Sequence, residues 1–207
     1  MVYMNGCSFV HQLSSISWGD RGRRSTDIKM CNDGIDGANN QHILRTTLSR
    51  NLKDYSYIYI GWSSVYRFEA VMNDGITYNI TEEGLDNHWQ LPTEQWIYDN
   101  FINQVLTLQN YLKYNNIPFF FFLSFDTLHH HFNNELFELI DEDTFPSLYN
   151  RDLVYQNYVI NKLGKSKAIN EYNDEGEIDG HPTKVARRVW LKYLNERRRF
   201  KPNWQGE

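Results

Sequence analysis

Short apolar runs alternate with amphipathic stretches along the chain, and this alternation predicts strands that are each followed by a helix. Buried strands are expected within MVYMNGCSF at the N-terminus, at 27–31, at 55–62, and in the segment FFFFLSFD that follows Pro118. The last segment begins with an uninterrupted apolar run. Such a run is typical of a strand that is buried on both faces of a parallel sheet.

Apolar residues recur at helical spacing between and after these strands. A helix is predicted from Asn40, with Asn39 or Asn40 as its N-cap, because a short amide side chain can accept a hydrogen bond from a free backbone amide. Further helices are predicted at 93–114, 135–140, 154–163 and 182–198, with Trp96 and Val185 among the residues expected to face the core. Residues 66–95 carry turn signals and are long for a plain loop, so we expect a hairpin or a lid there.

Strands that alternate with helices at this spacing predict an α/β fold, with a mainly parallel central sheet between two helical layers. The length of 207 residues suits one domain, which we expect to span residues 1–207. In this architecture binding sites form just beyond the carboxyl ends of the strands. The loops that follow the four predicted strands are therefore the places to search for chemistry.

Composition removes several classes of protein. A formal net charge of −5 argues against a general nucleic-acid partner, since phosphate neutralisation needs a surplus of Lys and Arg. No apolar segment has the length of a membrane span, and no secretory signal is visible, so we expect no membrane partner and a protein kept in, or packaged from, a cytoplasm. Two cysteines cannot form a disulfide framework or a four-ligand zinc site by themselves.

Two side chains at opposite ends of the chain could act together as a nucleophile and its base. Ser8 follows the first predicted strand, and His181 precedes the last predicted helix. A serine hydroxyl attacks a carbonyl only when a neighbouring imidazole takes its proton, and Asp179 could orient that imidazole. A serine that follows a glycine is by itself more often a turn residue, and a lone Asp-x-His more often a turn with a surface histidine. Their shared location at the predicted site edge favours the catalytic interpretation.

An attacked carbonyl also needs hydrogen-bond donors for the oxyanion that develops on its oxygen. The candidates are the backbone amides of Ser8 and Gly37 and the side-chain amide of Asn39 or Asn40. The alternative is that the Asn-rich turn only caps the helix that follows it. A run of histidines at 129–131 is interpreted as a surface segment, because adjacent residues cannot all face one ion, and we predict no metal and no other cofactor.

Four segments together resemble the SGNH (GDSL-like) hydrolase superfamily, and more narrowly a subgroup of it that is common in bacteriophages. These segments are NGCSF, GIDGANN, IGWSS and DGHP. The resemblance implies a flavodoxin-like three-layer fold with Ser8 as nucleophile, Gly37 as oxyanion donor and His181 as base. It requires no cofactor.

The sequence departs from this family pattern in two places. The third segment usually carries an Asn two positions after its Gly, where this chain has Ser63, so Trp62 and Ser63 would shape a weaker oxyanion hole. Asp179 lies two residues before His181, whereas the family spacing is three. The acid of the triad is therefore Asp179, Glu177 or neither.

Arg45, Arg67 and Glu69 occupy motif positions of the phage-type subgroup. We expect an Arg–carboxylate pair that braces the site loops, and the alternative is recognition of a substrate carboxylate. The function expected from the resemblance is hydrolysis of a small-molecule or glycan ester, for example deacetylation of an acylated glycan. The second hypothesis is a catalytically weak or inactive scaffold of phage origin that serves in the virion or against the host. The oligomeric state is left open.

Overall fold

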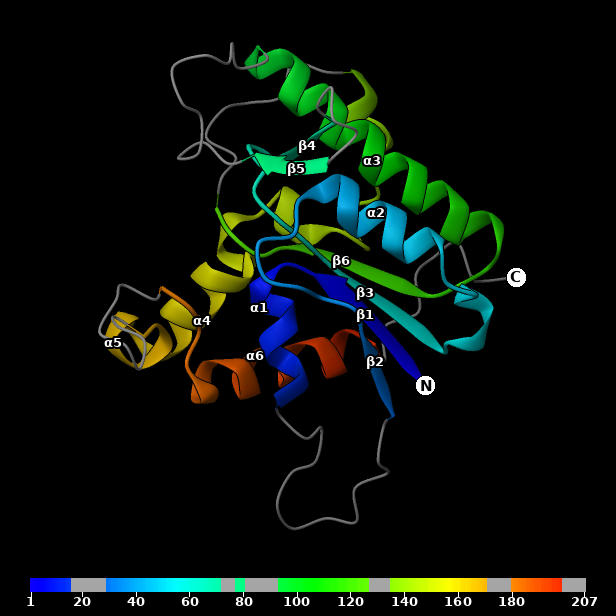
Figure 1. Cartoon of the computed structure of the whole chain (residues 1–207). Helices are drawn as coiled ribbons and strands as arrows, with labels where there is room; N and C mark the ends of the chain where they lie inside the picture. Colours follow the sequence, from blue (N-terminus) through cyan, green and yellow to red (C-terminus); the bar gives the residue numbers. More distant parts are fainter. Residues whose placement is uncertain (16–28, 72–76, 81–92, 127–134, 171–179, 199–207) are drawn as a thin grey trace.

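The central sheet has four parallel strands in the order β2-β1-β3-β6 (Figure 1). The computed structural model describes residues 1–15, 29–71, 77–80, 93–126, 135–170 and 180–198. The predicted α/β class and the parallel sheet are confirmed. The strands are β1 (Val2–Gly6), β2 (Met30–Asn32), β3 (Tyr57–Trp62) and β6 (Phe119–Leu123).

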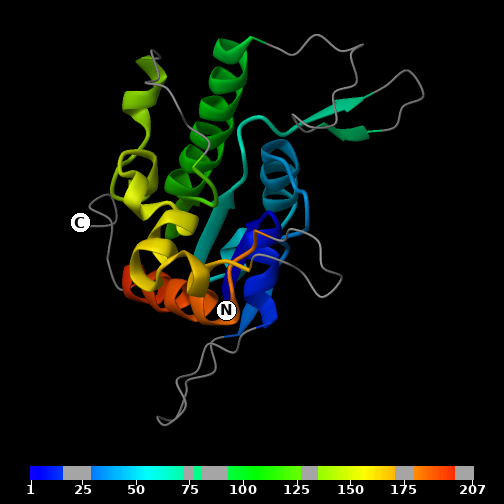
Figure 2. The same cartoon turned by 90° about the vertical axis from the view of Figure 1, so that its left-hand side faces the viewer.

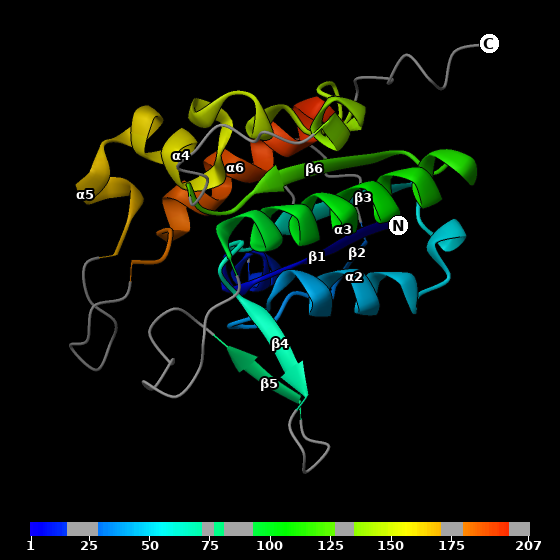
Figure 3. The ribbon, with the colours of Figure 1, turned by 90° about the horizontal axis from the view of Figure 1, so that it is seen from above.

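Helices cover both faces of this sheet. Helices α2 and α3 lie on one face, and α1 and α6 lie on the other, with α4 packed against α6 (Figures 1 and 3). None of the helices in the described residues could span a bilayer. The α-helices are α1 (Ser8–His11), α2 (Asn40–Leu48), α3 (Glu94–Tyr114), α4 (Tyr155–Leu163), α5 (Lys165–Ala168) and α6 (Lys184–Arg197). The 3₁₀ turns are η1 (Gln12–Ser15), η2 (Leu52–Asp54), η4 (Glu135–Leu139), η5 (Pro146–Leu148) and η6 (Arg151–Leu153).

Strand β6 is buried on both faces, which explains its uninterrupted apolar sequence. Successive side chains of a strand point to opposite faces of the sheet. The ring of Phe121 therefore packs against Trp62, which contacts Phe101 of α3, and the ring of Phe122 packs against Trp190 of α6. The aromatic residues in these positions fill the core on both sides of the sheet.

Helix α1 lies unusually close to the sheet because two glycines face it. A Cβ atom built on Gly6 or on Gly61 would lie 2.4 Å from Cγ2 of Val10. Such a distance is well inside van der Waals contact, so any larger residue would push α1 away from β1 and β3. This close approach fixes the position of the residue that begins α1, Ser8.

Three details of the sequence prediction are wrong. Trp96 and Val185 are exposed to 48% and 51%, so the apolar faces of α3 and α6 are narrower than their spacing indicates. Helix α6 begins at Lys184 with Thr183 as its N-cap, and Pro182 lies before the helix. The segment 135–140 forms the 3₁₀ turn η4 in place of an α-helix.

The stretch at 66–95 contains a two-stranded antiparallel hairpin formed by β4 (Phe68–Val71) and β5 (Thr77–Ile80). This hairpin belongs to a separate small sheet and extends away from the central one, beside α2 (Figures 2 and 3). The hairpin predicted for this stretch is therefore present. Its role as a lid stays a prediction.

Candidate active site

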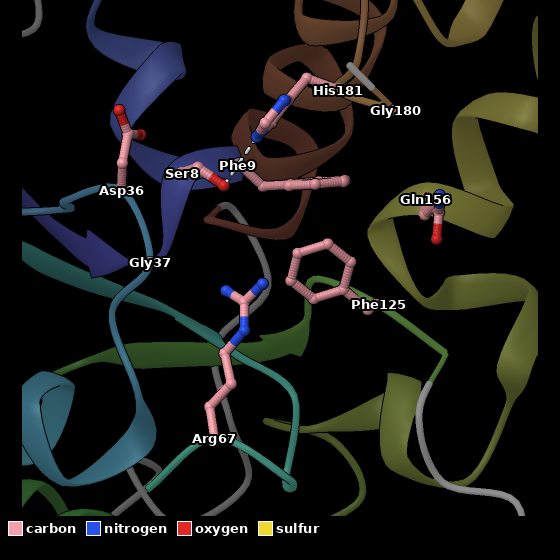
Figure 4. A pocket seen from close by; sticks show the side chains of 9 residues that line it. All are labelled: Ser8, Phe9, Asp36, Gly37, Arg67, Phe125, Gln156, Gly180 and His181. Atoms are coloured by element: carbon pink, nitrogen blue, oxygen red, sulfur yellow. Dashed lines mark hydrogen bonds between the residues drawn. The ribbon is translucent and has the colours of Figure 1, made fainter. Parts of the chain in front are cut away.

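Ser8 and His181 meet at the carboxyl end of the central sheet, although 173 positions separate them in the chain. The Nε2 atom of His181 lies 2.8 Å from Oγ of Ser8 (Figure 4). A hydrogen bond of this length joins a nucleophile and its base when the ring nitrogen accepts from the hydroxyl. Ser8 is only 7% exposed.

The position of Ser8 follows from the turn between β1 and α1. Cys7 is the N-cap of α1, and its carbonyl accepts from the amides of Val10 and His11. Val10 in turn packs on Gly6 and Gly61. The short helix is thus held at both its backbone and its side chains, and Ser8 is its first residue.

The position of His181 is set by backbone hydrogen bonds to a neighbouring segment. The amide of Asn170 donates to the carbonyl of His181 at 2.9 Å, and the amide of Gly180 donates to the carbonyl of Asn170 at 3.0 Å. Gly180 has a φ of +66°, a left-handed conformation that glycine adopts without strain. Thr183 continues the attachment, because its amide donates to the carbonyl of Ala168 and its hydroxyl to that of Lys167.

Arg187 joins the segment of His181 to the segment of Ser8. Its Nε donates to the carbonyl of Pro182 at 3.0 Å, and its Nη1 donates to the carbonyl of Gln12 at 3.2 Å. Pro182 follows His181, and Gln12 follows helix α1. The guanidinium group of Arg187 therefore connects the segment that carries Ser8 to the segment that carries His181.

The loop after β2 brings Gly37 to the same place. The amide of Ile35 donates to the carbonyl of Gly6, and Nδ2 of Asn32 donates to the carbonyl of Val10. The loop also contacts His11, whose Nδ1 lies 2.8 Å from the carbonyl oxygen of Gly34. Gly37 then adopts a φ of +72°, again the left-handed region that favours glycine.

A cavity of about 490 Å³ opens beside Ser8 and His181 (Figure 4). The predicted residues Ser8, Gly37 and His181 line this cavity. Several other lining residues were not indicated by the sequence. Phe125 lies two positions after β6, where the strand-end rule could have found it, whereas nothing in the sequence indicates Gln156 on α4. The lining residues are Ser8, Phe9, Asp36, Gly37, Arg67, Phe125, Gln156, Gly180 and His181.

Asn39 and Asn40 form hydrogen bonds elsewhere and do not line this cavity, so the donation by one of them to the oxyanion stays a prediction. Asn39 caps α2 by accepting from the amide of His42 at 2.8 Å, and its side chain also hydrogen-bonds Glu69. Nδ2 of Asn40 donates to the carbonyls of Ser63 and Ser64, and its Oδ1 accepts from the amide of Ser63 at 2.8 Å. Asn40 therefore clamps the loop after β3, and Asn39 is the cap that the sequence left open.

Trp62 and Ser63 are buried and do not line the cavity either. Trp62 packs edge-on against Phe101 and Phe121, as a core residue does. Ser63 is 1% exposed, and its Oγ has no hydrogen-bond partner within the described residues. The position that carries the family's Asn therefore does not supply a donor to this cavity.

The expected Arg–carboxylate pair forms between Arg45 and Glu69. Nη2 of Arg45 donates to Oε1 of Glu69 at 3.0 Å, and Nη1 donates to Oε2. The hydrogen bond from Arg45 holds the pKa of Glu69 below its usual value, against the opposing effect of burial. This ion pair connects helix α2 to β4. Arg67 does not belong to the pair, and its side chain lines the cavity.

Three solved structures resemble this fold. A GDSL-like lipase from Bacteroides thetaiotaomicron superposes with a TM-score of 0.51 at 12% identity, over 96% of this chain and 87% of that one. The chain has a GDSL-like fold. A predicted acylhydrolase from Bacteroides fragilis (13% identity, 96% and 86% coverage) and a predicted GDSL-like lipase from Parabacteroides merdae (11%, 97% and 95%) each give a TM-score of 0.47.

Sequence comparison adds no family. No family model matches the chain, and no curated protein matches it either. The GDSL-like fold therefore rests on the structure, and none of these comparisons supports the phage-type subgroup.

Several predicted residues lie outside the described part of this GDSL-like fold. Asp179 and Glu177, the candidates for the acid, belong to the stretch 171–179, and the histidines at 129–131 belong to 127–134. Among the described residues, no group of three or more His, Cys, Asp or Glu side chains could hold a metal ion. The described part of the candidate catalytic group therefore consists of Ser8 and His181, without the acid.

Proposed function

We propose that this protein hydrolyses carboxylic esters, with Ser8 as the nucleophile and His181 as the general base. The observation that carries the proposal is the 2.8 Å contact between Oγ of Ser8 and Nε2 of His181, at the edge of a cavity. The GDSL-like fold supports it by placing both residues beyond the carboxyl ends of parallel strands, where such folds bind ligands.

The reaction proceeds in two halves. Oγ of Ser8 attacks the carbonyl carbon while its proton passes to Nε2 of His181, and the tetrahedral intermediate collapses as the protonated imidazole gives that proton to the leaving alcohol. Water then attacks the acyl-serine with His181 again accepting the proton. The products are the acid, the alcohol and the regenerated hydroxyl of Ser8. Asp179 is the proposed partner that orients His181.

The oxyanion of each tetrahedral intermediate requires donors that already point to it. The proposed donors are the backbone amides of Ser8 and Gly37, because both residues line the cavity. The left-handed conformation of Gly37 presents backbone, without a Cβ, to the substrate.

Acylated glycans are the substrate class to test first. The rings of Phe9 and Phe125 form an edge-to-face pair at a centroid separation of 4.3 Å in the cavity wall. Phe9 is the buried member of this pair, so the partly exposed ring of Phe125 is the aromatic surface proposed to contact a sugar ring. Gln156 of α4 also lines the cavity and adds an amide that can pair with hydroxyl groups.

The decisive experiment measures hydrolysis of a chromogenic acetyl ester by the wild type and by Ser8→Ala. We expect turnover by the wild type and a loss of about 1,000-fold or more in the variant, since the nucleophile is gone. Ser14→Ala is the matched control, because Ser14 is exposed, follows the same helix and bonds only the carbonyl of His11 in the described structure. Equal rates for wild type and Ser8→Ala would remove Ser8 from the mechanism.

A fluorophosphonate probe separates this proposal from that of a non-catalytic scaffold. The probe should label Ser8 of the wild type and leave Ser8→Ala unlabelled. His181→Asn should slow the labelling, because the hydroxyl then lacks its base. A folded wild type that is inert toward both the ester and the probe would contradict the proposed function.

A further inference from the structure

Arg67 places a guanidinium group in the cavity, on the side from which Ser8 is reached. Arg67 lies in the turn after β3, where its amide donates to the carbonyl of Ser64 at 3.2 Å. Its side chain lines the cavity, and the guanidinium group points toward Ser8 (Figure 4). The ring of Phe125 lies beside this group, with the guanidinium carbon 5.5 Å from the ring centroid.

Three other arginines of the described structure form ion pairs, whereas no acid partner of Arg67 lies among the described residues. Arg45 pairs with Glu69, Arg50 pairs with Asp33, and Arg151 pairs with Asp126. In contrast, the Nη1 atom of Arg67 is buried and has no hydrogen-bond partner among the described residues.

Such a donor needs an acceptor, which either water or an oxygen of a ligand in the cavity can supply. A buried donor on a charged group that lacks an acceptor loses its hydration without compensation. Asp36, the carboxylate in the cavity lining, belongs to the loop after β2, and its side chain points away from Arg67 (Figure 4). The resting cavity therefore holds a positive charge that is suited to an oxygen bearing negative charge.

The place of Arg67 relative to Ser8 identifies that oxygen. Asn39 and Asn40 at the start of α2 do not line the cavity, and neither does Ser63 in the loop after β3. Arg67 comes from this same loop, and in Figure 4 its guanidinium group faces Ser8, with Gly37 beside the space between them. The carbonyl oxygen of an ester under attack by Ser8 would lie in this space.

We propose that Arg67 is a catalytic residue, which donates a charged hydrogen bond to the carbonyl oxygen as Ser8 attacks it. This inference rests on the proposed function. The carbonyl carbon forms its bond to Oγ of Ser8, the electron pair of the C=O double bond moves to oxygen, and Arg67 keeps its proton throughout. Because the negative charge exists only in the transition state and the intermediate, the interaction raises kcat and leaves KM nearly unchanged.

The test compares wild type, Arg67→Met and Arg67→Lys on two nitrophenyl esters, the neutral acetate and the anionic hemisuccinate. We expect kcat of Arg67→Met to fall by about 100- to 1,000-fold on both esters, with KM changed little. Arg67→Lys keeps the positive charge but lacks the paired donors of a guanidinium group, so its kcat should lie between those of the wild type and Arg67→Met. The matched control is Arg188→Met, an exposed arginine on α6, which should behave as the wild type.

Two results on these esters would overturn the proposal. Equal kcat values for wild type and Arg67→Met would exclude Arg67 from the chemical step. A loss confined to the hemisuccinate, and seen in KM, would make Arg67 a binder of a substrate carboxylate instead. Partial restoration of the kcat of Arg67→Ala by added guanidinium ion, with no increase in the kcat of the wild type, would support the catalytic role.

A second measurement keeps the test independent of turnover. Phenylboronic acid forms a negatively charged tetrahedral adduct on an activated serine, and its affinity can be measured by calorimetry on the wild type and on Arg67→Met. We expect binding weakened by about 100-fold or more in the variant, and equal affinity would overturn the proposal. A wild type that turns over neither ester contradicts the proposed function alone, and the boronate comparison still decides the role of Arg67.

Discussion

The segments that carry Ser8 and His181 are held in place by different forces. Ser8 begins a helix that packs without spare room against Gly6 and Gly61. His181 lies in a loop attached through backbone hydrogen bonds to Asn170 and through the side chain of Arg187. Steric packing tolerates almost no change in volume, whereas a set of hydrogen bonds can lose one member and remain folded. The two segments should therefore respond differently to substitution.

The largest effect is expected at the packed segment. In Gly61→Ala the new Cβ would lie 2.4 Å from Cγ2 of Val10 and 2.8 Å from Cε2 of Phe122. Overpacking of this kind should lower the free energy of unfolding by about 1–3 kcal/mol and displace α1, so that ester turnover falls as well. Urea unfolding and initial rates measure the two effects.

The double variant Gly61→Ala/Val10→Ala tests the cause. Removing Cγ2 of Val10 relieves the closest contact, so the double variant should lose less stability than the sum of the two single losses. Additive losses would show that the contact with Val10 does not position α1.

A smaller effect on stability is expected at the hydrogen-bonded segment. Arg187→Met removes the donors to the carbonyls of Pro182 and Gln12. We expect a stability loss of about 1 kcal/mol, together with a fall in kcat/KM of about 10- to 100-fold because His181 is no longer held against Ser8. Arg188→Met, its exposed neighbour on α6, is the control. Unchanged turnover in Arg187→Met would show that the backbone bonds alone position His181.

The smallest effect is expected at the Arg45–Glu69 pair, which touches neither segment. The pKa of Glu69 is lower in the folded protein than in the unfolded chain, so folding is favoured by its ionisation. This contribution is present above the unfolded pKa of about 4.3 and is lost as the pH falls through the folded pKa.

The measurement at this pair is the difference in unfolding free energy between wild type and Glu69→Gln as a function of pH. A partly exposed pair should give about 1 kcal/mol or less at pH 7 and nothing well below pH 4. A difference that persists at low pH would assign the effect to packing, and not to charge.

The backbone positions of the candidate site could be predicted because they follow from the sheet. Ser8 begins the helix after β1, Gly37 and His181 lie in loops, and α/β topology brings these segments together beside the carboxyl end of the sheet. The same argument explains why the apolar sequence of β6 indicated its burial. These predictions depend on strand order and chain direction, which periodicity and turn residues encode.

The directions of individual side chains could not be predicted in this way. Asn40 and Arg67 both flank the loop after β3, yet Asn40 clamps its backbone while Arg67 enters the cavity. Which of two nearby polar residues faces a ligand depends on a single turn at 64–66, and no periodicity describes that turn. Val185, in the first turn of α6 after the N-cap Thr183, is likewise exposed although its spacing predicted burial.

The hydrogen bond between Ser8 and His181 also has a consequence in time. During synthesis Ser8 leaves the ribosome 173 positions before His181. Until then the hydroxyl has no imidazole beside it, however well β1 and α1 have formed. A chain that ends before residue 181 lacks the proposed base, so the proposed activity requires both segments to have folded together.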